Sequence, residues 1–395
     1  MKSSLEVADI FRAFGPAYRQ QYGDQLSIEQ LRAMRAIEVC RTAVLGGHVD
    51  HCDQCGATRI CYNSCRNRHC PKCQFLDKER WVDAQQQLLL PVPYFHVVFT
   101  LPSELRPLAL RNQQVVYGLL FKAASQTLLE LSRDPVHLGA QIGCTALLHT
   151  WSQTLAYHPH LHCIVTGGGL SDEATRWVGC KDFFLPVKVL SRLFRGKLLA
   201  FLRQAYAAGD LSFPGCIAAW QRPAAFKAVL APLYEKDWVV YCKPPLGDAK
   251  QTLAYLGRYA HRVALSNDRL VGLEEDQVTF CYRDRADGNQ IKSMHLEAFE
   301  FIRRFLCHVL PHQFIKIRHY GLLSTRNRKT KLKHAQQLLG TAPSASEAVA
   351  KVAWDELLFR LTGVDPRICP HCGQGTMIAK EVLLPLAERA PPLRV

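Results

Sequence analysis

The feature that most constrains the fold is a segment rich in cysteine and histidine near the N-terminus. Seven of the sixteen cysteines lie between residues 40 and 73, among turn residues and with little apolar periodicity. Two Cys-x-x-Cys pairs, Cys52 with Cys55 and Cys70 with Cys73, are separated by fourteen residues. Such pairs form short turns whose thiolates converge on one ion, and four thiolates complete a tetrahedral Zn²⁺ site. We therefore predict a small zinc-binding module here, with these four cysteines sharing one ion.

Further potential ligands remain in the same segment. We expect a second zinc site built from Cys40, His48, Cys65 and His69. Basic residues sit among these ligands, so the module is expected to face a phosphate backbone. They are Arg66, Arg68 and Lys72.

A third pair, Cys369-Pro-His-Cys372, lies near the C-terminus and is half of a zinc ribbon. It could take distant ligands, use His371 and a water, or bind no metal.

A second constellation is the run HPHLHCIV, residues 158–165. In an extended strand His160 and His162 point to one face, as a pair of metal ligands would. Gln153, at the end of the preceding apolar run, is our candidate third ligand. Two imidazoles and an amide oxygen suit Mg²⁺ or Mn²⁺. The alternative is a histidine-triad nucleotide hydrolase with a nucleophilic histidine, which needs His158 on the same face.

A third constellation is a tyrosine pair in a helix expected over residues 248–261. Tyr255 and Tyr259 are four residues apart and share a helix face, next to Arg258 and Arg262. A phenol becomes a useful nucleophile when nearby positive charge favours phenolate.

The charge balance indicates a polyanionic partner. Lys and Arg outnumber Asp and Glu by 49 to 34, a net charge of +15. A segment over residues 314–334 holds seven Lys or Arg and no acid, and we expect a basic helical region that binds DNA through Arg326, Arg328 and Lys329.

No secretory signal is visible and no Walker-type phosphate loop is present, so we expect a cytoplasmic protein that does not hydrolyse ATP.

The periodicity of the remaining chain predicts mixed helices and strands. Helices are expected over 28–39, 78–90, 104–132, 187–207 and 296–309, and strands over 94–101, 145–155, 160–166, 238–242, 269–273 and 278–283. Without regular βαβ alternation, this order indicates an α+β fold with an antiparallel sheet.

Together these stretches resemble the two-tyrosine HUH transposases of rolling-circle insertion sequences, the IS91 family. The matching stretches are YNSCRNRHCPKCQ (62–74), HVVFTLP (96–102), HPHLHCIVTGGG (158–169), YLGRYAHRVALSN (255–267) and IRHYGLLSTRNR (317–328).

The resemblance implies an HUH nuclease core, a central antiparallel sheet flanked by helices, preceded by a small zinc-binding domain. We expect a helical and zinc-binding domain over 1–90, the nuclease over 91–290, the basic region over 291–340 and the tail with its half ribbon over 341–395. His160 and His162 would bind the catalytic metal, and Tyr255 and Tyr259 would be the nucleophiles. The implied substrate is single-stranded DNA with hairpins at insertion-sequence ends, cut through a 5′-phosphotyrosine. A host helicase and the host replication machinery would unwind the DNA, and the protein would be associated with the bacterial nucleoid.

Two other functions stay open on the sequence. The triad hydrolase explains only the histidine run. A zinc-dependent DNA-binding regulator explains the charge and the cysteines but gives the histidine strand no role.

Overall fold

The computed structural model describes residues 5–86, 88–180, 185–243, 251–252, 257, 264–284, 286–341 and 353–386. Within these ranges the chain has helices and antiparallel sheets, which confirms the α+β class.

A long antiparallel sheet forms the centre of the molecule. Its strands run in the order β11-β4-β5-β3-β7, and β6 pairs with β5. They are β3 (Tyr94–Thr100), β4 (Ala140–Trp151), β5 (Tyr157–Ser171), β6 (Trp177–Gly179), β7 (Val240–Lys243) and β11 (Ile317–Gly321). The strand pair expected from the histidine run is confirmed; β5 is longer than predicted, and β4 begins and ends earlier than the predicted 145–155.

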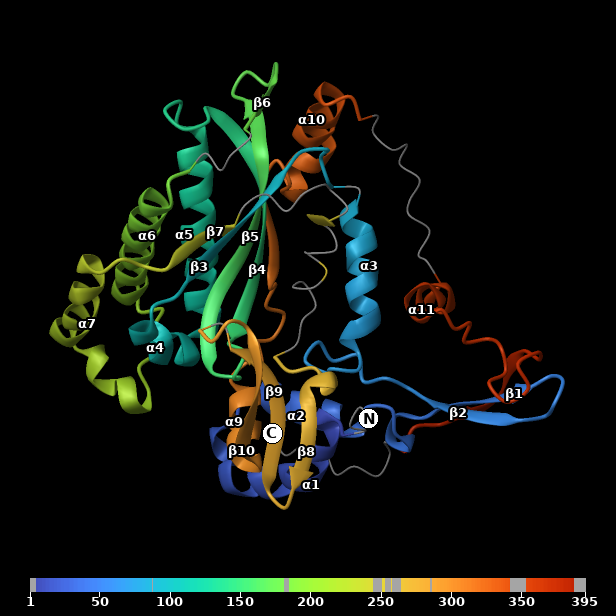
Figure 1. The fold of residues 1–395 in the computed structure, drawn as a ribbon. Helices are drawn as coiled ribbons and strands as arrows, with labels where there is room; N and C mark the ends of the chain where they lie inside the picture. Colours follow the sequence, from blue (N-terminus) through green and yellow to red (C-terminus); the bar gives the residue numbers. More distant parts are fainter. Residues whose placement is uncertain are drawn as a thin grey trace.

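Three helices cover one face of this sheet, and a fourth packs outside them against α6 (Figure 1). The three are α4 (Arg106–Arg111), α5 (Gln113–Arg133) and α6 (Val187–Ala207), and the outer helix is α7 (Pro223–Glu235). Residues that alternate along the strands, such as Leu161 and Cys163 on β5, are fully buried in the core on this side. Because strand residues alternate between faces, His160 and His162 are left on the opposite face.

On that opposite face lie α3 (Gln74–Gln86) and α10 (Lys333–Leu338) (Figure 1). They cover one end of the sheet through a small core that includes Leu147, Ile164 and Ala335.

A second core lies below the sheet and joins segments from both halves of the chain. It contains α1 (Val7–Tyr22), α2 (Ile28–Val39), α9 (Ala298–Leu306) and a three-stranded sheet of β8 (Leu270–Glu274), β9 (Gln277–Asp284) and β10 (Gln290–Glu297). Phe11 meets Phe305 edge-on at 5.3 Å between ring centroids. The N-terminal helices therefore share a core with residues on both sides of position 290, the predicted boundary between the nuclease and the basic region.

A third sheet projects from the body and carries the tail. It is formed by β12 (Met377–Leu383), β1 (Gly47–Cys52) and β2 (Thr58–Tyr62), in that order. Helix α11 (Trp354–Thr362) precedes the tail strand (Figure 1). Short 3₁₀ helices occur at Gly23–Gln25, Ala43–Leu45, Ser103–Leu105, Gly215–Gln221, Asn267–Arg269 and Thr325–Asn327.

The basic segment is only partly the helical region that was predicted. Its first part is strand β11, whose residues Ile317 to Gly321 pair with β4, and a π-helical turn (Arg328–Leu332) leads into α10. Pairing with β4 satisfies the backbone groups on one side of this edge strand, which a free surface helix would satisfy within itself. None of the helices within the described ranges is long and apolar enough to span a lipid bilayer.

Candidate active site and metal centres

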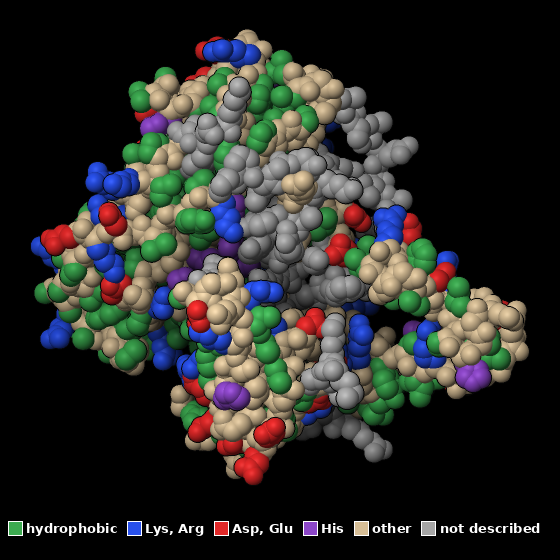
Figure 2. Space-filling model, viewed as in Figure 1, with side chains coloured by type: hydrophobic (Ala, Val, Ile, Leu, Met, Phe, Trp, Pro, Cys, Tyr) green, Lys and Arg blue, Asp and Glu red, His purple; other side chains and the backbone are tan. Residues whose placement is uncertain are grey.

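Three adjacent strands bring four histidines to one face of the central sheet. His96 lies on β3, His149 on β4, and His160 and His162 on β5. His149 is paired directly with His160 in the β4–β5 ladder, and residues that face each other in a ladder point to the same side. In the space-filling view, histidine side chains are visible between the helices that cover the central sheet and the β8–β10 sheet (Figure 2).

Three of these imidazoles converge on one point. Ring nitrogens of His149, His160 and His162 all lie within 4.8 Å of one another. The Nε2 atoms of His160 and His162 are 3.1 Å apart. Two nitrogens about 2.1 Å from an ion and at right angles would be separated by roughly 3.0 Å, so this spacing fits two adjacent positions around a divalent cation.

The outer ring nitrogens are held by neighbouring groups. His160 Nδ1 lies 2.7 Å from the carbonyl oxygen of His158, so Nδ1–H donates and Nε2 keeps its lone pair. His162 Nδ1 lies 2.8 Å from Nε2 of His96, and the two rings stack with 13° between their planes. Trp151 stacks on His149 at 4.6 Å between centroids. Such outer contacts fix the tautomer and orientation of a ligating imidazole.

His158 is engaged elsewhere. A guanidinium N–H of Arg106 donates to its Nδ1 at 2.7 Å. Burial, and then the charge of Arg106, lower the pKa of His158. Because Nδ1 accepts from Arg106, the neutral ring carries its proton on Nε2, and neither nitrogen has a free lone pair for nucleophilic attack.

Gln153 lies in the turn between β4 and β5. Its backbone carbonyl accepts a hydrogen bond from Arg269 at 2.5 Å. The third imidazole beside the His160–His162 pair is that of His149, which lies four residues before Gln153 in the chain. The role of Gln153 as a ligand stays a prediction.

The predicted nucleophiles and their basic neighbours lie outside the described residues. They are Tyr255, Arg258, Tyr259 and Arg262. Gln251, Thr252 and Gly257, which flank and interrupt this stretch, are helical, in line with the helix expected there.

His96 and His149 were not predicted from the sequence as site residues. A signal was present in both cases, because each histidine alternates with buried apolar residues: His96 is followed by Val97 and Phe99, and His149 is preceded by Leu148. A buried polar residue among such neighbours indicates a built contact.

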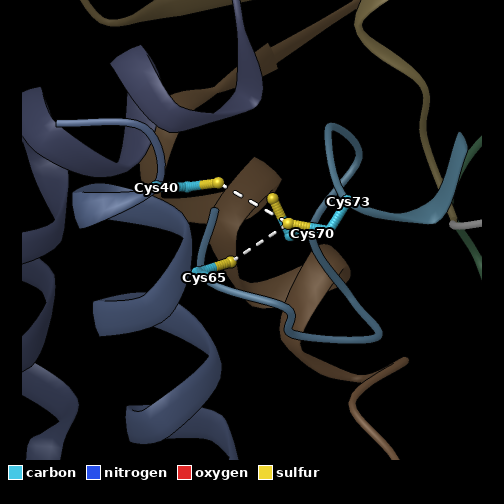
Figure 3. Close-up of side chains that lie close together, drawn as sticks. All are labelled: Cys40, Cys65, Cys70 and Cys73. Carbon is cyan, nitrogen blue, oxygen red and sulfur yellow. Dashed lines mark hydrogen bonds between the residues drawn. The ribbon is translucent and has the colours of Figure 1, made fainter. Parts of the chain in front are cut away.

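Four thiols from the zinc-binding module converge between α2 and the loop before α3 (Figure 3). They belong to Cys40, Cys65, Cys70 and Cys73. The sulfur of Cys73 lies 3.7 Å from that of Cys40 and 3.6 Å from that of Cys65. The hydrogen bond from the Cys65 thiol, with that from Cys70, lowers the pKa of Cys40 to about 7. Four thiols at these distances suit tetrahedral Zn²⁺.

The predicted grouping of ligands was therefore wrong. Cys70 and Cys73 share a cluster with Cys40 and Cys65, while Cys52 and Cys55 lie with Cys369 and Cys372. The reason is the β1–β2 hairpin, which carries the Cys52 turn away from the body and beside the C-terminal tail (Figure 1).

The two histidines expected at the second zinc site lie outside both cysteine clusters. His48 contacts the carboxylate of Asp50 at 3.3 Å, and the same carboxylate accepts from Cys61 and Arg59. His69 accepts a hydrogen bond from the backbone of Leu310 at 3.3 Å through Nε2.

The cations of the zinc module do not act alike. Arg68 donates to the backbone carbonyls of Phe314 and Pro311 at 2.6 and 2.7 Å, and burial lowers its pKa. It therefore joins the module to the body, contrary to the prediction that it faces phosphate. Lys72 forms an ion pair with Glu6 at 2.5 Å, whereas Arg66 is exposed.

In the basic segment, Arg326 and Lys329 are exposed. Arg328 is half-buried, donates to the carbonyl of Leu323 at 3.4 Å, and has its pKa lowered by burial. Two of the three predicted DNA contacts are thus open to solvent.

Comparison with known proteins gives matches along most of the chain. Residues 10–101 match a family described as "Transposase zinc-binding domain", and residues 143–331 match one described as "Putative transposase". The chain is 51% identical to "Putative transposase y4qJ" of Sinorhizobium fredii, over 96% of each chain. It is 28% identical to the transposase for insertion sequence element IS801 of Pseudomonas savastanoi pv. phaseolicola, over 88% of this chain and 82% of the relative. No solved structure matches.

Proposed function

Because the chain belongs to the IS91 family of insertion-sequence transposases, we propose that it nicks and joins single-stranded DNA through a covalent 5′-phosphotyrosine. The observation that carries this proposal is the convergence of His149, His160 and His162 on one face of an antiparallel sheet. Such a cluster is the metal site that an HUH nuclease core would need.

The three imidazoles fit a divalent cation. His160 and His162 present Nε2 atoms 3.1 Å apart, and His149 supplies a third nitrogen in place of the amide of Gln153. A set of nitrogen ligands favours Mn²⁺ over Mg²⁺. When bound, the cation would neutralise charge on the non-bridging oxygens of a phosphodiester.

In the proposed reaction, the phenol oxygen of Tyr255 or Tyr259 bonds to the phosphorus and the bond to the 3′ oxygen breaks. The phenolic proton leaves for solvent or a nearby base, and the leaving 3′ oxygen is protonated. One phosphate diester replaces another, so the bond energy is kept and no ATP is needed. In the joining step, a free 3′-hydroxyl attacks the phosphotyrosine and releases the phenol.

Binding of the strand would rest on the exposed cations and on unpaired bases. Arg66, Arg326 and Lys329 are exposed and can contact phosphates, which supply most of the affinity for nucleic acid. We propose insertion-sequence ends, single-stranded or folded into hairpins, as the substrate, with strand separation supplied by the host.

The two other functions have less support. His158 contacts Arg106 and so is not placed as a triad nucleophile. A DNA-binding regulator without catalysis has no use for four histidines gathered on one sheet face, with His149 and His162 only 4% and 7% exposed.

The test is a cleavage assay with single strands from both ends of the insertion sequence. A strand labelled at its 3′ end should yield a labelled protein band in denaturing electrophoresis, and one labelled at its 5′ end should yield a shorter free strand. Tyr255→Phe or Tyr259→Phe should weaken or remove the adduct, and the double variant should remove it. An adduct that survives in the double variant would exclude these tyrosines, and cleavage without any adduct would exclude covalent catalysis.

A further inference from the structure

Two short turns at opposite ends of the chain have the same pattern. Residues 52–56 and 369–373 both read Cys-x-x-Cys-Gly. In each turn the glycine has a positive φ, 71° for Gly56 and 70° for Gly373, and its N–H donates to the carbonyl of the first cysteine. Glycine adopts this left-handed conformation without strain. The two turns are therefore structural copies of one another.

The four thiols of these turns face each other. The sulfur of Cys52 lies 3.7 Å from that of Cys372, and the sulfur of Cys55 lies 3.8 Å from that of Cys369. All four sulfurs lie within 4.8 Å of one another.

Backbone amides also point at the sulfurs. The N–H of Cys55 donates to the sulfur of Cys52 at 3.4 Å, and the N–H of Gly375 donates to the sulfur of Cys372 at 3.3 Å. Hydrogen bonds of this kind favour the thiolate, which is the form that binds metal.

The chain around the turns is built to hold them together. Strand β12 pairs with β1, and Asp53 and Thr376 form reciprocal contacts: the Asp53 N–H donates to the Thr376 carbonyl at 3.1 Å, and the Thr376 N–H donates to the Asp53 carboxylate at 2.7 Å. A side chain at Gly375 would lie 2.3 Å from the sulfur of Cys52, so only glycine fits beside this cluster.

Hydrophobic burial gives the tail little stability of its own. In residues 353–386 the buried positions are Leu357, Cys369 and Gly375, and strand β12 is largely exposed. A segment that buries so little apolar surface needs another source of stability, such as a metal.

We propose that Cys52, Cys55, Cys369 and Cys372 bind a second structural Zn²⁺, which fastens the C-terminal tail to the β1–β2 hairpin. This ion is distinct from the one assigned to Cys40, Cys65, Cys70 and Cys73. The matched zinc-binding family model covers residues 10–101, so half of the ligands of this second site lie outside it.

Zinc content of the purified full-length chain tests the proposal. Wild-type protein should hold two zinc ions per chain. Cys369→Ser/Cys372→Ser should hold one, Cys52→Ser/Cys55→Ser should also hold one, and the quadruple variant should still hold one because both pairs serve the same ion. The matched control is Cys216→Ser/Cys281→Ser, which changes two cysteines outside the clusters and should keep two ions.

Amide hydrogen exchange separates loss of this site from general unfolding. In either double variant, the amides of β12 should exchange faster while those of β4 and β5 keep their protection. Retention of two ions after Cys369→Ser/Cys372→Ser, or unchanged protection of β12, would overturn the proposal. Neither measurement depends on DNA cleavage, so the result is independent of the proposed function.

Discussion

The Nε2 atom of His96 lies 2.8 Å from Nδ1 of His162, and both rings are buried. If His162 binds metal through Nε2, its proton must sit on Nδ1, and His96 is the group that accepts it. His96 therefore acts on the proposed metal site through His162, as a positioning residue.

We expect His96→Ala to lower the affinity of the site for Mn²⁺ by about 10- to 100-fold, the usual effect of losing such an outer contact. Cleavage should then need more Mn²⁺ and should recover at saturation. His96→Gln, whose amide oxygen can accept the same proton, should behave nearly as wild type. The measurement is a Mn²⁺ titration of cleavage beside direct Mn²⁺ binding followed by electron paramagnetic resonance.

The control for this prediction is His295→Ala, because His295 is exposed on β10 away from the cluster. A loss of cleavage in His96→Ala that no Mn²⁺ concentration restores, with the fold intact, would contradict a positioning role.

The third metal ligand can be assigned by comparing His149→Ala with Gln153→Ala. We expect the first to abolish Mn²⁺ binding and cleavage, as His160→Ala and His162→Ala should. Gln153→Ala should retain both, since Gln153 is held through its backbone carbonyl and His149 supplies the third nitrogen beside the His160–His162 pair. Zinc content should be unchanged in all four variants, because the cysteine clusters are separate. The reverse pattern, with Gln153→Ala inactive and His149→Ala active, would restore the assignment made from sequence.

The elements with strong local signals could be predicted from the sequence. Helix α2 matches its predicted range and begins at Ile28 because Ser27 and Gln30 form a capping box, and α6 also matches its predicted range. The His160–His162 strand could be found because both histidines alternate with buried residues.

The contacts between distant segments could not be predicted. Spacing alone cannot tell whether Cys52 and Cys55 meet Cys70 or Cys369, because that choice depends on where the β1–β2 hairpin carries them. His149 joins the site through strand register, which is set by packing along the whole sheet. The partners of Arg68 are backbone carbonyls, and because every residue has one, the sequence cannot indicate which of them Arg68 contacts.

The exposed cations of the basic segment should contribute to DNA binding. Neutralising Arg326 and Lys329 as glutamines should weaken binding similarly for all sequences and flatten the salt dependence, by roughly 0.7 units of log–log slope per lost phosphate contact on single strands. Adding Arg328→Gln should change the slope less, because this side chain is half-buried. Lys227→Gln, an exposed lysine on α7, is the control. A salt titration that gives the wild-type slope for the double variant would show that these cations do not contact DNA phosphates.

Arg68 should affect stability and leave the salt dependence of DNA binding unchanged. Its guanidinium donates to two carbonyls of the 311–314 segment, and Arg68→Lys cannot keep both contacts in the same geometry. We expect a loss on the order of 2 kcal/mol in the free energy of unfolding, as for hydrogen bonds to a charged group. Arg66→Gln, an exposed change in the same loop, should leave stability within about 0.5 kcal/mol. Arg68→Gln, which also removes the charge, should likewise destabilise the fold and keep the wild-type salt slope; a flattened slope with normal urea unfolding in this variant would return the residue to the DNA interface.

His308 is held neutral between two partners. The Thr150 hydroxyl lies 3.2 Å from Nδ1, and Nε2–H donates to the carbonyl of Leu155 at 3.1 Å. Burial lowers the pKa of His308 to about 4. Arg68, His69 and Lys316 line the same cavity.

In the unfolded chain the pKa of His308 is near 6.5, so the unfolded state takes up a proton first as the pH falls. The contribution of His308 to stability is therefore complete above pH 6.5 and is lost between pH 6.5 and 4. The full effect is on the order of 3 kcal/mol. Burial lowers the pKa of Lys316 only to about 8, so that group does not titrate in this window.

His308→Gln can keep both hydrogen bonds and cannot be protonated, so it isolates this effect. Urea unfolding of wild type and variant at pH 7.5 and pH 4.5 should show the wild type losing about 2–3 kcal/mol more than the variant across that range. Other titrating groups, including His69 and the cysteine ligands, are the same in both proteins and cancel in the difference. A difference between the two proteins that stays constant with pH would mean that His308 is protonated as readily in the folded chain as in the unfolded one.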